Sequence, residues 1–163
     1  MLVVTLESTM NLHLADMTHS PLDRQQIALR VPHNGIMCLL ERASAWNEDG
    51  ISVSAVSHVT LDNPLRENGT LSALCAVEYA GQAMALHGSL LAQAVNPRPG
   101  FLASVRDVEL SRARLDDLPD PLDIRVRRLA GDGKMALYSF DVSSGMIKVA
   151  SGRMAVAFGE AGS

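Results

Sequence analysis

One long, mainly apolar stretch, residues 71–95, constrains what this chain can fold into more than any other feature. Its sequence is LSALCAVEYAGQAMALHGSLLAQAV. Apolar residues recur at steps of three and four, which predicts a single long helix, and the other faces are nearly as apolar. A helix of this kind is either buried in a core or spans a membrane. Because Gln82, His87 and Gln93 interrupt the stretch, no clean run of about 18 apolar residues exists, and the pattern favours a buried helix.

Glu78 is the only formally charged residue of this stretch. A carboxylate in such a place needs a partner, a shifted pKa or a functional role, and we expect a functional role. Gln82 lies one turn later on the same face, where it could orient Glu78 or bind the same ligand. Gly81 and Gly88 also share one face of the helix. Since glycine lowers helix propensity, their presence indicates close approach of another backbone.

Composition limits the class of protein. The chain has 163 residues, 47% of them hydrophobic and 4% aromatic, which predicts one domain with an aliphatic core. The net charge of −4 argues against a nucleic-acid-binding protein. Cys38 and Cys75 lie in apolar runs, so buried free thiols are expected rather than a disulfide. No metal-ligand spacing is present, no cofactor is implied, and the absence of a signal-peptide pattern predicts a cytoplasmic protein.

Alternating and β-rich segments predict strands on both sides of the helix. Before it we expect strands at Leu2–Leu6 and from Ile51 onward, and Thr70 or Ser72 as the helix cap. After it, four strands in a meander are expected at residues 101–110, 122–129, 135–142 and 146–158. One antiparallel sheet with one buried helix is an α+β arrangement. Residues 1–29 are expected to form an N-terminal strand and arm, and residues 30–163 a single domain.

The histidines and cysteines supply the candidate catalytic groups. His33 and His58 border loops that could approach the helix, although a structural role is the simpler interpretation of each. His87 is nine residues past Glu78, about 13 Å along the helix axis, so the two cannot touch. Cys75 is expected to be a small buried residue rather than a nucleophile, because nothing near it in sequence lowers its pKa.

From about Arg30 to Phe158 the chain resembles the hotdog-fold 3-hydroxyacyl-[acyl-carrier-protein] dehydratases. The segment VPHNGIMCLLERASAW is similar to the family's early PHRxPFLLVDRV segment, and GTLSALCAVEYAGQAMA to its PGVLxxEAMAQ helix. Glu78 matches the acidic residue of that helix. The resemblance implies a hotdog fold, in which an antiparallel sheet wraps around one long central helix. The sequence looks closest to the divergent aryl-polyene-type branch, whose members pair with a more typical dehydratase subunit.

The resemblance also implies a mechanism and site residues. In the family, a loop histidine removes the α proton of a 3-hydroxyacyl thioester, and the acidic residue on the partner's helix assists departure of the hydroxyl. Here the family's histidine falls on Pro64, and NPLRENGTLSA replaces its HFPGxPxxPG loop. The nearest loop histidine, His58, is therefore the candidate base beside the acid Glu78. Amides at the helix start would polarise the thioester carbonyl. The expected substrate-binding residues are Ala73, Leu74, Cys75, Gln82, His33 and Asn63.

Three functions stay open on the sequence. The first is a dehydratase acting on 3-hydroxyacyl thioesters of acyl carrier protein, with the acyl chain along the helix face near Leu74 and Met84. The second is a hotdog acyl thioesterase in which Glu78 activates water. The third is a non-catalytic partner subunit of a heteromeric dehydratase. In each case we expect a homodimer, or a heterodimer with a related dehydratase, formed through the strand at residues 101–110, with neither metal nor nucleic acid bound.

Overall fold

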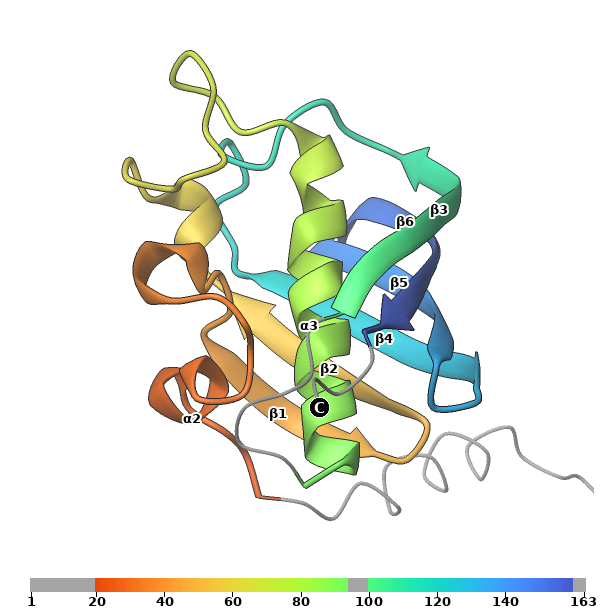
Figure 1. The fold of residues 1–163 in the computed structure, drawn as a ribbon. Coiled ribbons are helices and arrows are strands. Elements are labelled where there is room, and N and C mark those ends of the chain that lie inside the picture. The colour runs from red at the N-terminus through yellow and green to blue at the C-terminus, as the bar shows by residue number, and fades with distance from the viewer. Residues whose placement is uncertain (1–19, 94–99, 160–163) are drawn as a thin grey trace, which may run out of the picture.

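A six-stranded antiparallel sheet curves around one helix, α3 (Ala76–Leu91) (Figure 1). The computed structural model describes residues 20–93 and 100–159. The strands are β1 (Arg42–Asn47), β2 (Gly50–Ala55), β3 (Gly100–Leu110), β4 (Leu122–Gly131), β5 (Met135–Ser144) and β6 (Ile147–Phe158). The shorter elements are α2 (Arg24–Ala28) and three 3₁₀ helices, η1 (Gly35–Met37), η2 (Ser57–Val59) and η3 (Ala73–Cys75).

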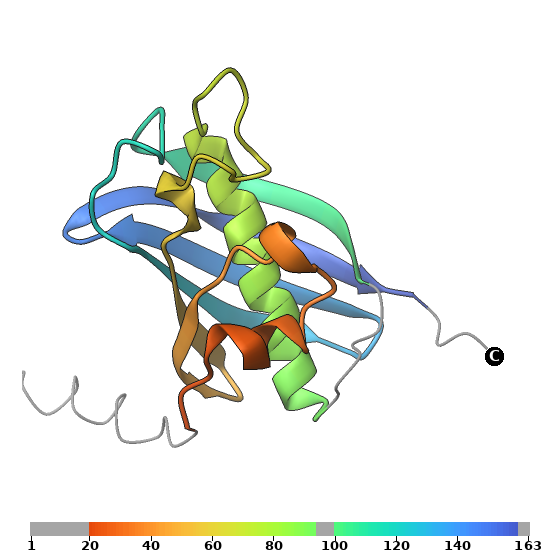
Figure 2. The same ribbon diagram turned by 90° about the vertical axis from the view of Figure 1, so that its left-hand side faces the viewer.

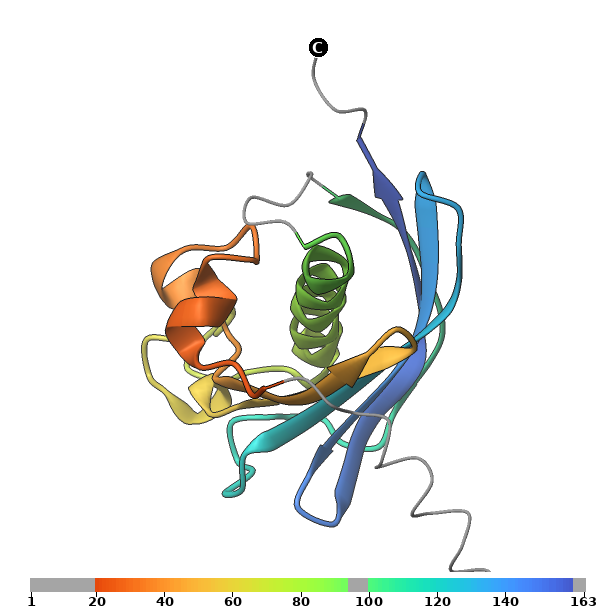
Figure 3. The same ribbon diagram turned by 90° about the horizontal axis from the view of Figure 1, so that it is seen from below.

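The core lies between α3 and the inner face of the sheet. Seen along α3, the sheet covers one side of the helix, and the segment that carries α2 and η1 covers another (Figure 3). In β4 the alternation predicted from sequence places Leu122, Ile124 and Val126 in the core, because successive strand residues point to opposite faces. The α+β architecture of a sheet wrapped around one central helix is therefore confirmed.

The central helix is shorter than its apolar pattern. Residues 73–75 form η3, and α3 ends at Leu91, while residues 94–99 lie outside the described part of the chain. Ser72 caps η3, since its Oγ accepts a hydrogen bond of 3.2 Å from the Leu74 amide, whereas the N-cap of α3 itself is Cys75, which makes no side-chain cap bond. The helix continues through Gly81 and Gly88, where an added Cβ would meet nothing within 4 Å. The expected close approach of a backbone is thus wrong within the described part of the chain.

The predicted four-strand meander is also wrong. The sheet order is β1-β2-β4-β5-β6-β3, so only β4, β5 and β6 form a meander and β3 lies at the edge beside β6. The connection from β3 to β4 crosses the start of α3, where the Ala73 amide donates to the Ala113 carbonyl and the Leu115 amide to the Leu71 carbonyl, each at 2.9 Å. These bonds between distant segments leave no periodic signal in the sequence.

The sequence pattern also missed β1. A register shift between Ala43 and Ala45 interrupts the two-residue alternation that would have revealed the strand. The other strand expected before α3, at residues 2–6, lies outside the described residues.

Residues 20–29 are part of the domain rather than a separate arm. A capping box starts α2, with the Asp23 side chain bound to the Gln26 amide and the Gln26 side chain to the Asp23 amide. Ile27 is fully buried in the core, and Leu22 pairs with Ala43. The boundary expected at residue 29 therefore does not hold.

His87 is a structural residue, as its position far from Glu78 indicated. Its Nε2 donates to the Asn47 carbonyl at 2.8 Å, and its Nδ1 accepts from the Tyr138 hydroxyl at 2.9 Å. Burial lowers the pKa of His87 and raises the pKa of Tyr138 to about 12. Within the described ranges, no helix is long and apolar enough to cross a membrane.

Candidate active site

Glu78 stands in the first turn of α3 and is paired with a histidine. Its Oε1 lies 3.2 Å from Nε2 of His33, and the two side chains are 40% and 29% exposed. A carboxylate and an imidazole at this distance are close enough to act on neighbouring atoms of one bound molecule. The structure thus gives the lone charge of the apolar stretch both a partner and access to solvent.

The segment that leads from α2 to η1 passes across α3 (Figure 2), and it contains His33. The Val31 amide bonds to the Ile27 carbonyl at 3.1 Å, and the Val31 side chain is buried. Gly35 then adopts a φ of +59°, a conformation that favours glycine, and begins η1. His33 is therefore held between a buried anchor and a tight turn, directly over Glu78.

Gln82 connects this segment to the helix from inside the protein. Its Oε1 accepts from the Leu39 amide at 2.9 Å, and its Nε2 donates to the Met37 carbonyl at 2.8 Å and to Glu78 Oε1 at 3.1 Å. The side chain is fully buried. Of the two roles expected for Gln82, orientation of Glu78 agrees with this geometry, whereas direct substrate binding does not.

The structure does not bring His58 to Glu78. The His58 ring is 1% exposed, and its Nε2 donates to the Leu118 carbonyl at 3.1 Å. Burial lowers its pKa, which keeps the ring neutral. The ring belongs to the core where η2 meets the β3–β4 connection, so it is not placed to act as the base beside Glu78.

Asn63 is held by hydrogen bonds inside the protein and lines a hollow together with Ile36 and Ser57. It is 5% exposed, and its Nδ2 donates to the Tyr79 hydroxyl at 3.0 Å and to the Ser57 carbonyl at 2.8 Å. The Ser57 hydroxyl also lies 2.8 Å from the Tyr79 hydroxyl. These bonds fasten the loop after η2 to α3 on the inner side of the helix.

The amides expected to polarise a carbonyl are already hydrogen-bonded. The Ala73 amide donates to the Ala113 carbonyl at 2.9 Å, the Leu74 amide to Ser72 Oγ at 3.2 Å, and the Cys75 amide to the Ser72 carbonyl at 3.0 Å. The 3₁₀ turn at the helix start therefore uses the donors that a simple helix would leave free. These three amides are not available to a thioester.

Exposed apolar side chains border the Glu78–His33 pair in sequence. Leu74, one turn before Glu78, is 57% exposed, and Ile36 and Met37, just after His33, are 56% and 38% exposed. Met84, the other residue expected along the acyl chain, is buried in the core. The accessible apolar surface is thus at the start of α3 and on η1, not farther along the helix.

Neither cysteine offers an activated nucleophile. Both are free thiols, Cys38 buried and Cys75 partly buried, and burial raises the pKa of each. Among the residues that the structure describes, no group of three or more His, Cys, Asp and Glu side chains could hold a metal ion.

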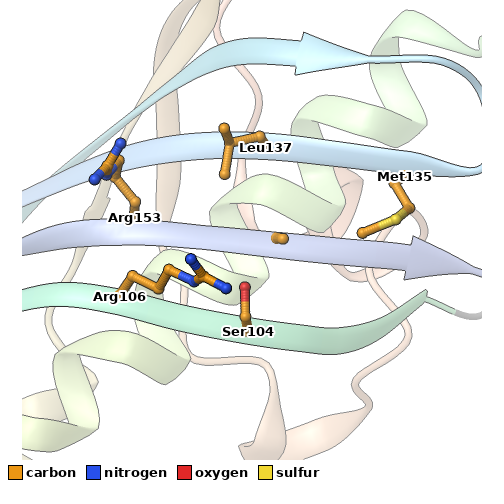
Figure 4. Close-up of a pocket in the computed structure, with 6 residues that line it drawn as sticks. Ser104, Arg106, Met135, Leu137 and Arg153 are labelled. Atoms are coloured by element: carbon orange, nitrogen blue, oxygen red, sulfur yellow. The ribbon is translucent and has the colours of Figure 1, made fainter.

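A hollow of about 370 Å³ lies on the outer face of the sheet, away from α3 (Figure 4). It is lined by Ser104, Arg106, Met135, Leu137, Arg153 and Ala155. The Arg153 guanidinium is paired with Asp107. The lining contains no acid–base pair, so the Glu78–His33 pair is the better candidate for catalysis.

Sequence reasoning placed His33 among the substrate-binding residues and missed its pairing with Glu78. The signal was present in VPHNG, since Pro32 and Gly35 hold the histidine in a short, sharply turned segment. What the sequence could not show is that this segment crosses α3 at the first turn.

The sequence matches the model of a protein family described as ApeP dehydratase over residues 25–160. The structure is similar to the dehydratase heterocomplex ApeI:P from Xenorhabdus doucetiae, with 20% identity, a TM-score of 0.72 and coverage of 82% of this chain and 91% of that chain. An HP0420 homologue from Helicobacter felis matches with 14% identity, a TM-score of 0.57 and coverage of 91% and 97%. A hypothetical thioesterase from Streptococcus pneumoniae TIGR4, solved with coenzyme A, matches with 13% identity, a TM-score of 0.53 and coverage of 72% and 84%. A comparison with curated proteins gives no match.

Proposed function

Because the chain belongs to the ApeP dehydratase family, we propose that it removes water from 3-hydroxyacyl thioesters carried by an acyl carrier protein. The observation that carries this proposal is the contact of 3.2 Å between His33 Nε2 and Glu78 Oε1 on an accessible face. Dehydration needs a base and an acid on neighbouring atoms of one substrate. This pair supplies both from a single chain.

In the proposed reaction, His33 is the base and Glu78 is the acid. The His33 imidazole removes the proton from the carbon next to the thioester carbonyl. The carbon–oxygen bond at the next carbon then breaks, the protonated Glu78 gives its proton to the departing hydroxyl, and water leaves. A conjugated carbon–carbon double bond remains. Transfer of the proton from His33 to Glu78 across their contact restores the starting pair.

The acyl chain is proposed to lie on the exposed apolar side chains beside the pair. Leu74 extends from η3, just before α3, and Ile36 and Met37 extend from η1, all more than a third exposed. Covering them with an alkyl chain removes apolar surface from water.

We further propose that the site works in a cytoplasmic assembly with a second subunit, either a copy of this chain or a related dehydratase. The edge strand β3 pairs only with β6 among the described strands, and it exposes the apolar side chains of Phe101, Leu102, Val105 and Leu110. An unpaired apolar edge of this length is suited to pairing with another chain. The heterocomplex of ApeI and ApeP provides the precedent for a heteromeric form.

The test is the formation of the conjugated enoyl thioester by the purified protein, alone and with the second subunit, followed by ultraviolet absorbance. Glu78→Gln keeps the shape of the side chain and removes its exchangeable proton, so the proposal expects loss of enoyl formation with the fold intact. Release of free thiol without enoyl product would instead indicate the thioesterase alternative. Absence of both products in each preparation would indicate a non-catalytic subunit.

A further inference from the structure

Gln82 stands where the two sides of the candidate active site meet. It belongs to α3, one turn after Glu78, and it bonds to the backbone on both sides of Cys38. That backbone continues directly from η1 and the segment carrying His33. One buried amide therefore contacts the helix side of the site and the segment side at once.

The orientation of this amide is fixed by the backbone. The Leu39 amide can only donate, so it requires the Gln82 oxygen, and the Met37 carbonyl can only accept, so it requires the Gln82 nitrogen. The second N–H of that nitrogen is then directed at Glu78 Oε1, 3.1 Å away. Exchange of the oxygen and nitrogen would mismatch three contacts, one of them buried and two partly buried, which is costly away from solvent.

Glu78 Oε1 consequently lies between two groups, Gln82 Nε2 at 3.1 Å and His33 Nε2 at 3.2 Å. We infer that Gln82 is a positioning residue that sets the separation of Glu78 and His33 from both sides. It holds the carboxyl by direct donation and the histidine through residues 37–39. The inference rests on the proposed function for its catalytic meaning, but the geometric part does not need it.

The reason such a residue matters is the sensitivity of proton transfer to geometry. A misplacement of about 1 Å can lower a catalytic rate by about a hundredfold. Glu78 and His33 are both partly exposed, so packing alone does not fix their side chains. The buried Gln82 amide is held by its own hydrogen bonds, so it can fix the positions of the partly exposed Glu78 and His33.

The experiment compares Gln82→Met and Gln82→Glu with Tyr138→Phe as the matched control. Methionine has a similar volume but no hydrogen bonds. Glutamate still accepts from the Leu39 amide but places a second carboxyl beside Glu78. Tyr138→Phe removes another buried hydrogen bond to α3, the one to His87, without touching the site.

We expect Gln82→Met to lower kcat of enoyl formation at least tenfold with little change in KM, whereas Tyr138→Phe keeps the kcat of folded protein within twofold. Gln82→Glu should shift the pH–kcat profile toward higher pH, because a second carboxyl beside Glu78 favours the protonated form of the pair. If Gln82→Met does not fold, the test of the positioning role rests on Gln82→Glu alone. A Gln82→Glu protein with an unshifted pH–kcat profile and the wild-type kcat would overturn the inference.

A crystal structure of the folded variant separates this inference from the proposed function. The inference predicts that His33 Nε2 and Glu78 Oε1 move beyond hydrogen-bond distance when the amide is replaced, whether or not the wild-type protein is active. An unchanged His33–Glu78 contact would refute the positioning role. Wild-type inactivity together with a separated pair would refute the proposed function alone.

Discussion

Replacement of His33 and of His58 should separate catalysis from stability. The His33–Glu78 contact joins two partly exposed side chains, and pairs of this kind contribute about 0–1 kcal/mol. His33→Gln should therefore leave the melting temperature within a few degrees of wild type. If His33 is the base, the same change lowers kcat of enoyl formation by about 10²–10⁴.

His58→Ala should do the opposite. The ring is 1% exposed and donates to the Leu118 carbonyl, so its removal leaves a buried acceptor without a partner, which costs about 1–3 kcal/mol before any packing loss. For a chain of this size, each kcal/mol lowers the melting temperature by about 2–4 °C. The protein that remains folded should keep its kcat.

The assay measures initial rates of enoyl formation at a temperature where circular dichroism shows both variants to be folded, and the melting temperature of each in the same buffer. A folded His58→Ala protein that has lost kcat, beside a His33→Gln protein that retains it, would refute the assignment of the base to His33.

Two further predictions concern the pH dependence of folding and the assembly. Burial lowers the pKa of both His58 and His87, so the unfolded chain binds protons below about pH 6.5 that the folded chain does not. The free energy of unfolding is therefore highest above that pH and falls as the pH drops through it, by up to about 1.4 kcal/mol per pH unit for each histidine. Urea unfolding at pH 7.5 and 5.5 measures this loss, and equal free energies of unfolding at both pH values would contradict the prediction. For the assembly, Val105→Lys on the edge strand β3 should shift the mass in light scattering from dimer to monomer, because a charged edge resists pairing. The control Leu129→Lys, at a 47% exposed position on β4, should stay dimeric; equal behaviour of the two variants would show that β3 is not the interface.

The parts of the fold that sequence predicted are those with strict local periodicity. The apolar stretch gave α3, and the alternation of Leu122, Ile124 and Val126 gave β4. The strand β1 escaped because the register shift near Ala43 disrupts its alternation. The pairing of β3 with β6 could not be predicted from the sequence, because tertiary contacts determine which strands pair and the local residue pattern does not.

The candidate site divides in the same way. Glu78 was recognisable because a single charge in an apolar helix is costly unless it is used. On sequence His58 was preferred to His33 as the base, because it is the loop histidine nearest to the position of the family's base. Only the path of the segment after α2 places His33 on the first turn of the helix and leaves His58 in the core. The bonds of Gln82 to residues 37 and 39 likewise join segments more than forty residues apart.

The central claim is that His33 and Glu78 of the same chain form the acid–base pair, whereas in the resembling dehydratases the two groups come from different subunits. Mixing His33→Gln and Glu78→Gln chains, unfolding them together and refolding them tests this directly through the recovered rate of enoyl formation. If the pair lies within one chain, no mixed dimer contains an intact site, and the mixture stays as inactive as either variant. Recovery of about a quarter of the wild-type rate, expected when random pairing makes half of the dimers mixed and each gains one intact site, would contradict the account.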